Sequence, residues 1–89
     1  MKTFDELVAQ KNRFIGGRIE TRESGNQHFE DTIEDLVIED GIFIVVTAHK
    51  PNISTNIEFS GNLYPGNSEN KICFRIPYVG SAYLYARKE

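Results

Sequence analysis

The side chains best suited to binding a partner lie near the C-terminal end of the chain. Tyr83 and Tyr85 stand two positions apart, with Arg75 before them and Arg87 after them. Residues two apart in a strand share one face of a sheet, so the two rings are expected to lie together. Exposed Tyr and Arg side chains form hot spots in protein interfaces, and such rings also stack the bases of single-stranded nucleic acid. The competing interpretation is that the tyrosines only fill the wall of a small barrel, with their hydroxyls in solvent.

A second candidate surface is acidic. Eight Asp and Glu residues lie between positions 20 and 40, against Arg22 alone. They include adjacent pairs such as Glu34 and Asp35, but neighbours in a strand point to opposite faces, so such a pair is not a converged catalytic dyad. The ordinary interpretation is a solvated face of a hairpin. The functional interpretation is a docking surface for a basic partner, with Glu34 and Asp35 as its binding residues.

Residues for metal binding or catalysis are few. His28, His49 and Cys73 are the soft ligands, and none has the local spacing of a zinc site. We therefore predict no metal and no cofactor. Ser60 lacks the preceding glycine of a nucleophile elbow. Cys73 and His49 could form the Cys–His pair of a cysteine-dependent enzyme, which is kept as a hypothesis. The prediction, however, is that the protein is not an enzyme.

The elements that position these residues begin with a helix at residues 3–13. Thr3 and Glu6 have the spacing of a capping box, in which each side chain satisfies a free backbone N–H of the other. Phe4, Leu7 and Val8 form a narrow apolar stripe. A helix of three turns is marginal alone, so we expect it to pack on the rest of the domain.

Strands follow this helix. Residues 14–22 alternate, and Gly16-Gly17 near their start indicates a bend or bulge. Asp40-Gly41 between two apolar runs is a strong hairpin signal, which pairs residues 32–39 with residues 42–49. Residues 42–46 are apolar on both faces, which predicts a strand covered on both sides. Residues 29–39 also have apolar residues at helical spacing, so a helix is the alternative there.

Three further strands are predicted in the second half of the chain. The first lies in residues 52–60, around positions 56–59. The second covers residues 71–79, where Pro77 favours an edge position, and the third covers residues 82–87. Gly80-Ser81 is the predicted turn between the last two, and Leu63-Tyr64 are predicted to add a short pairing.

These elements predict one domain over residues 1–89, with a helix at 1–13 and an antiparallel β domain at 14–89. The fold class is mainly β (α+β): a short N-terminal helix followed by five to six antiparallel strands, either as a small barrel or as a curved open meander. A helix before a small barrel with a glycine-marked first strand is similar in outline to SH3-like barrels. That outline implies no particular function.

Composition limits the function classes. The net charge of −3 argues against a uniformly basic nucleic-acid binder. One cysteine allows no internal disulfide, and no run approaches the length of a membrane-spanning helix. The chain is therefore expected in the cytoplasm, away from membranes. The predicted function is a non-enzymatic protein–protein interaction module, such as a small regulatory or adaptor subunit, with a homodimer as one option; the alternative is a small barrel that binds single-stranded nucleic acid.

Overall fold

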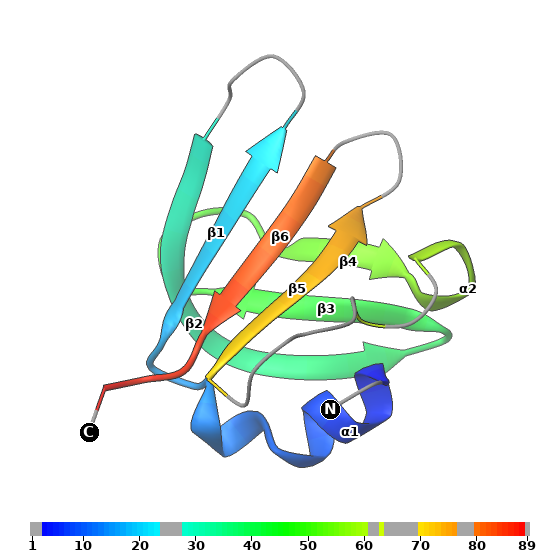
Figure 1. Ribbon diagram of the computed structural model, residues 1–89, viewed down its shortest axis with the longest axis horizontal. Coiled ribbons are helices and arrows are strands. Elements are labelled where there is room, and N and C mark those ends of the chain that lie inside the picture. The colour runs from blue at the N-terminus through cyan, green and yellow to red at the C-terminus, as the bar shows by residue number, and fades with distance from the viewer. Residues whose placement is uncertain (1–2, 24–27, 61–62, 64–69, 77–79, 89) are drawn as a thin grey trace.

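A computed structural model of the chain describes residues 3–23, 28–60, 63, 70–76 and 80–88. Six antiparallel strands form one sheet, preceded by a short helix and interrupted by a second one (Figure 1). The elements in chain order are α1 (Phe4–Ala9), a 3-10 helix (Lys11–Arg13), β1 (Arg18–Glu23), β2 (His28–Glu39), β3 (Ile42–Thr47), β4 (Ile53–Asn56), α2 (Ile57–Ser60), β5 (Lys71–Ile76) and β6 (Gly80–Tyr85).

The sheet is open and strongly bent. Its strand order is β4-β3-β2-β1-β6-β5, so β4 and β5 are its edges and do not pair to close a barrel. The long strand β2 crosses both halves: its first part pairs with β1 and its second part with β3. Figure 1 shows β3 and β4 running across the direction of β1, β6 and β5. Of the two predicted architectures, the open curved meander is confirmed and the closed barrel is wrong.

A β-bulge explains the ambiguous apolar pattern of β2. The register shifts between Ile33 and Asp35, so one extra residue is accommodated in β2 opposite β3. Ile33 and Leu36 both lie in the core although they are three positions apart. The helical spacing in the sequence is therefore the signature of a bulged strand. The strand interpretation is confirmed, and the helical alternative is wrong.

The predicted N-terminal helix is present but shorter than residues 3–13. Thr3 Oγ1 accepts a hydrogen bond from the backbone N–H of Glu6 at 3.2 Å, which confirms Thr3 as the N-cap. Gln10 leaves helical geometry at φ −110° and ψ 23°, so α1 ends at Ala9 and a 3-10 turn continues to Arg13.

The Asp-Gly hairpin is confirmed. Asp40 has φ +52° and Gly41 has φ +75°, the two left-handed residues that a type I′ turn requires. On either side of this turn, β2 and β3 pair from Glu39↔Ile42 through to Ile33↔Thr47.

The later elements differ from their predicted bounds. The strand predicted in residues 52–60 is present as β4, but its placement around positions 56–59 is wrong. β4 ends at Asn56, whose Oδ1 accepts the N–H of Glu58 at 2.9 Å and starts the helical turn α2. The predicted turn residues Gly80-Ser81 begin β6 instead. β5 is an edge strand, as Pro77 suggested, but Pro77 itself and Tyr64 lie outside the described residues.

The core fills the concave side of the bent sheet, and α1 covers one end of it. Phe4 of α1 packs its ring against Phe43 of β3 at 4.9 Å and against Phe74 of β5 at 5.5 Å, and these last two rings are 5.4 Å apart. This aromatic cluster joins the helix to both halves of the sheet, so burial of Phe4 and Leu7 is what holds the short helix in place.

Only one face of β3 is buried. Its residues alternate between half-buried and buried, with Phe43, Val45 and Thr47 on the inner side. The prediction that β3 is covered on both sides is wrong for the residues that the structure describes, because its apolar outer side chains pack on no second layer there.

Candidate functional site

The outer face of strands β1, β6 and β5 carries the two tyrosines that the sequence analysis selected for partner binding. On β6, Ala82 and Leu84 point into the core, and Tyr83 and Tyr85 therefore point outward, where both are half-buried. The alternation along residues 82–85 places both rings on one face, as the sequence predicts. We call this surface, with the cations described next, the aromatic–basic face.

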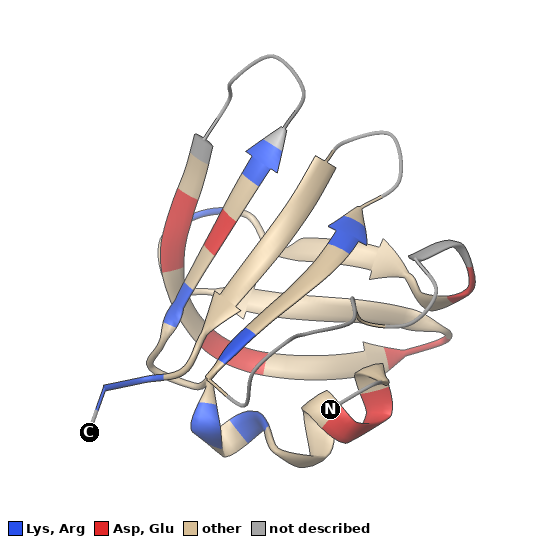
Figure 2. Ribbon diagram, viewed as in Figure 1, with Lys and Arg blue, Asp and Glu red and all other residues tan. Residues whose placement is uncertain are grey.

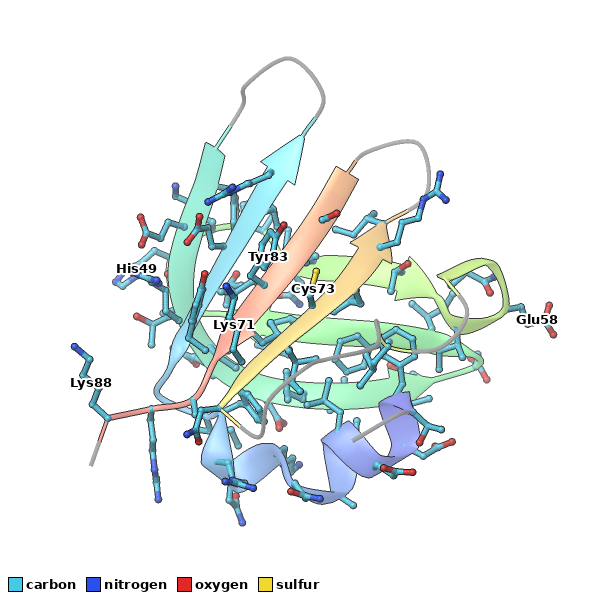
Figure 3. The ribbon with its side chains drawn as sticks, in the orientation of Figure 1. His49, Glu58, Lys71, Cys73, Tyr83 and Lys88 are labelled. Carbon is cyan, nitrogen blue, oxygen red and sulfur yellow. The ribbon has the colours of Figure 1, made fainter. Side chains whose placement is uncertain are left out.

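Cations from the neighbouring strands lie over both tyrosine rings. The Arg18 guanidinium carbon of β1 is 4.3 Å from the centre of the Tyr85 ring, and that of Arg22 is 5.4 Å from the Tyr83 ring. From β5, Lys71 Nζ lies 5.4 Å from the Tyr83 ring and 5.5 Å from the Tyr85 ring. The strand register produces these contacts, since Tyr85 is paired with Arg18 on one side and with Lys71 on the other. Figure 3 shows Lys71, Cys73 and Tyr83 on one face of β5 and β6.

Two glutamates fix the arginines of this face. Glu20 lies between them on β1, with Oε2 3.7 Å from Arg18 and Oε1 3.4 Å from Arg22. Glu30 of β2 is 3.2 Å from Arg18. The Glu20 side chain is only 10% exposed and that of Arg18 is 51% exposed, so the carboxylate is covered while the guanidinium stays available to a partner. Figure 2 shows this order along β1, with a red position between two blue ones.

Cys73 lies on the same face, opposite Tyr83. Burial raises the pKa of its thiol, and this outweighs the hydrogen bond with Tyr83 and the charge of Lys71, which lower it. A raised pKa keeps the sulfur protonated, whereas a nucleophilic cysteine needs a lowered one. The position of Cys73 therefore gives no support to the hypothesis of a cysteine-dependent enzyme.

A close backbone crossing supports the C-terminal end of the face. A Cβ atom at Gly17 would lie 2.1 Å from the carbonyl oxygen of Tyr85, so only glycine fits there. The predicted bend at Gly16-Gly17 is confirmed, because Gly16 has φ +88° and both residues bond to Ile33 of β2. An open hollow of about 770 Å³ lies beside this crossing, and its lining includes Arg18, Tyr85, Arg87 and Lys88.

The two predicted arginines lie at the ends of this face and not at its centre. Arg75 is exposed on β5 opposite Ser81, two pairs beyond Tyr83. Arg87 follows β6 and lines the hollow, and its backbone N–H donates to the carbonyl of Arg13. The cations on the rings are ones that the sequence did not assign, namely Arg18, Arg22 and Lys71. The sequence indicates that Arg18 and Arg22 share one face of a strand, but it does not indicate that this strand pairs with β6.

Glu34 and Asp35 lie away from the tyrosines, at the bulge of β2. The Asp35 Oδ1 atom is 3.1 Å from Lys11 Nζ and also accepts the N–H of Leu36 at 2.8 Å. The bond from Lys11 and the bond from Leu36 together lower the pKa of Asp35. Asp35 therefore ties the 3-10 helix to the sheet, whereas Glu34 is exposed.

Asp31 is a structural carboxylate that sequence reasoning did not single out. It is buried in β2 and accepts the backbone N–H groups of His49 at 2.9 Å and Lys50 at 2.7 Å, and that of Thr32 at 2.7 Å. His49 Nδ1 lies 3.1 Å from Oδ1 of the same carboxylate. Burial alone would raise the pKa of Asp31, but these hydrogen bonds outweigh it and hold the pKa well below its ordinary value. Asp31 thus anchors the turn after β3.

The three soft ligands belong to different parts of the sheet. His49 follows β3, Cys73 lies on β5, and His28 begins β2. Among the described residues, no group of three His, Cys, Asp or Glu side chains could hold a metal ion. Within the same residues, neither helix is long and apolar enough to cross a membrane. Comparison of the chain with protein-family models, with curated proteins and with solved structures finds no match.

Proposed function

We propose that this protein is a non-enzymatic interaction module that binds another protein through the aromatic–basic face. One observation carries the proposal: two half-buried tyrosines stand side by side on the outer face of the sheet with three cations over their rings. The core on the other side of β6 is complete without them. Tyr and Arg are the residues that dominate binding energy in protein interfaces.

The charges of the face indicate an acidic partner. Among the side chains that the structure describes, four cations on β1 and β5 outnumber the two carboxylates paired with them, which are Glu20 and Glu30. The ring contacts hold Arg18 and Arg22 in place before binding, so less side-chain entropy is lost when a partner's carboxylate meets them. A surface that presents Asp or Glu beside aliphatic or aromatic side chains fits this face.

Affinity capture tests the proposal. Immobilised wild-type protein is expected to retain an acidic protein from a lysate of the source cells, in stoichiometric amount and less at high salt. The variant Tyr83→Thr with Tyr85→Thr keeps strand propensity and is expected to lose the partner while its circular dichroism stays unchanged. Equal retention by the folded variant would contradict the proposal.

Single-stranded nucleic acid is the second candidate. It is favoured by the two-residue spacing of the tyrosines along β6, which suits the stacking of successive bases beside cations. Glu20 and Glu30 weigh against it, because they would repel a phosphate backbone at the same arginines. Protein purified at low salt with excess absorbance at 260 nm would support this candidate, and a clean spectrum would reject it.

The cytoplasmic location, a homodimer and the adaptor or regulatory role stay predictions. They depend on the identity of the partner, which the capture experiment would supply.

A further inference from the structure

The other half of the sheet has an outer face of opposite character. Val37 of β2 and Ile42, Ile44 and Val46 of β3 point away from the core and are half-buried. None of the four belongs to the core or packs against it. Val37 is paired with Ile44, so the four side chains are contiguous. We call them the aliphatic row.

The aliphatic row is bordered differently on its two sides. On the β2 side lie three exposed carboxylates, with Glu34 at the bulge and Glu39 and Asp40 at the hairpin turn. On the β4 side, Ser54 is opposite Ile44 and Asn56 is opposite Ile42, and both are uncharged. Figure 2 shows the red positions along β2 and at the end of its hairpin.

The core does not depend on the row or on its acidic border. Asp35, the carboxylate opposite Val46 at one end of the row, is already engaged by Lys11 at 3.1 Å. Glu34, Glu39 and Asp40 are exposed, and they lie beside an apolar strip that faces water at a cost of roughly 25 cal/mol for each Å². A contiguous apolar patch with a polar rim is a feature of interaction sites, and like charges along its border favour a partner of opposite charge.

We propose that the aliphatic row docks an amphipathic segment of another protein, with an apolar stripe for the row and Lys or Arg residues along one flank for Glu34, Glu39 and Asp40. A helix packed on a sheet is one of the stable ways in which a sheet buries an apolar face. The row runs along β3 from Ile42 to Val46, which is four residue steps or about 13 Å at the rise of a strand. Two to three turns of helix would cover this length. This surface is separate from the aromatic–basic face, so one molecule can hold two partners of opposite charge.

Two other occupants are less compatible with the structure. Addition of a strand at the β4 edge is limited, because β4 has only four residues and continues into α2. A second copy would have to place its aromatic–basic face on the row, since its own row repeats the same carboxylates. That contact is head-to-tail and leaves one face of each kind open at the ends of an assembly.

The test uses the whole chain and two designed helical peptides as probes. The first peptide has a leucine stripe with lysines on one flank, and the second has glutamates in place of those lysines. For the lysine peptide, we expect saturable binding, with changes in the ¹⁵N NMR spectrum centred on Ile42, Ile44 and Val46. The glutamate peptide is expected to bind at least tenfold more weakly.

Two matched variants locate the site. Ile44→Thr with Val46→Thr is expected to weaken the lysine peptide at least tenfold, whereas Tyr83→Thr with Tyr85→Thr should change its affinity less than twofold. Both variants introduce β-branched side chains suited to strands, and the spectrum of each reports whether it is folded. The proposal is overturned by equal binding of the two peptides, or by spectral changes centred on β6. It is also overturned if sedimentation shows self-association that Ile44→Thr abolishes, because the row is then covered by a second copy.

Discussion

The two outer faces of this sheet differ far more than its two inner halves do. Inside, β3 and β5 contribute rings to one aromatic cluster with Phe4 of α1. Outside, β1, β6 and β5 carry tyrosines under cations, whereas β2 and β3 carry aliphatic side chains beside carboxylates. The inner side chains of both halves must pack together into one core. The fold places no such requirement on the outer side chains. The candidate functions therefore lie outside, one on each half.

The largest expected effect on stability comes from comparing an inner residue of β3 with its outer neighbour. Phe43→Ala should lower the free energy of unfolding by about 3–5 kcal/mol, because it empties the centre of the aromatic cluster. Its neighbour Ile44 points outward, so Ile44→Thr should cost less than about 1 kcal/mol. Urea unfolding of both variants measures the difference. Equal losses would mean that the outer face of β3 is also covered.

Backbone crowding gives the next effect. Gly17→Ala forces a Cβ to within 2.1 Å of the Tyr85 carbonyl oxygen, and this overpacking should destabilise the fold by about 3 kcal/mol. Gly41→Ala is the matched control, because a Cβ there meets no atom within 4 Å and only the φ of +75° is unfavourable. That left-handed backbone should cost an alanine about 1–2 kcal/mol. Thermal unfolding compares the two variants. A Gly17 variant as stable as the Gly41 variant would contradict the crossing that supports the aromatic–basic face.

Local signals in the sequence were sufficient for most elements. The cap at Thr3, the turn at Asp40-Gly41 and the alternation of residues 71–76 each depend on neighbours within a few positions, and each is present. The bulge in β2 was not predictable in the same way. It appears in the sequence only as Ile33 and Leu36 three apart, a spacing that a helix shares.

The candidate site was half predictable. Tyr83 and Tyr85 share a face because of local alternation, so the sequence identified them. Arg18 and Lys71 contact the Tyr85 ring because β6 pairs with β1 on one side and with β5 on the other. The pairing of β6 with β1 joins distant segments, and no short sequence pattern predicts it. The charge count instead selected Arg75 and Arg87, which lie at the borders of the face.

Asp31 and Asp35 should contribute differently to the loss of stability at low pH. The folded-state pKa values of Asp31 and Asp35 are lowered, so their ionised forms stabilise the fold above about pH 4, the ordinary value for Asp, and this contribution is lost as the pH falls below it. Asp31→Asn should flatten the acid side of the stability curve more than Asp35→Asn, because Asp31 is buried and accepts three backbone N–H groups. Urea midpoints measured across the acid range check this order. A midpoint that falls more steeply with pH in Asp31→Asn than in Asp35→Asn would contradict it.

The smallest effect tests whether the cations of the aromatic–basic face serve stability. Arg18→Gln should lower the free energy of unfolding by only about 0.5–1 kcal/mol, since the Arg18 side chain is half exposed and the covered Glu20 carboxylate keeps its ion pair with Arg22. Arg75→Gln is the control on the same face, opposite Ser81. As an exposed surface substitution, it should change the free energy of unfolding by less, within about 0.5 kcal/mol. A large loss for Arg18→Gln would assign these contacts to the fold and not to binding.

Titration of the captured acidic partner against two double variants shows whether the outer face of β1, β6 and β5 is the binding surface. Tyr83→Thr with Tyr85→Thr is expected to raise the Kd at least tenfold, about 1.4 kcal/mol. Ile44→Thr with Val46→Thr, on the other outer face, is expected to leave it within twofold. The reverse order, or an equal effect of the two variants, would mean that the partner does not bind at the aromatic–basic face.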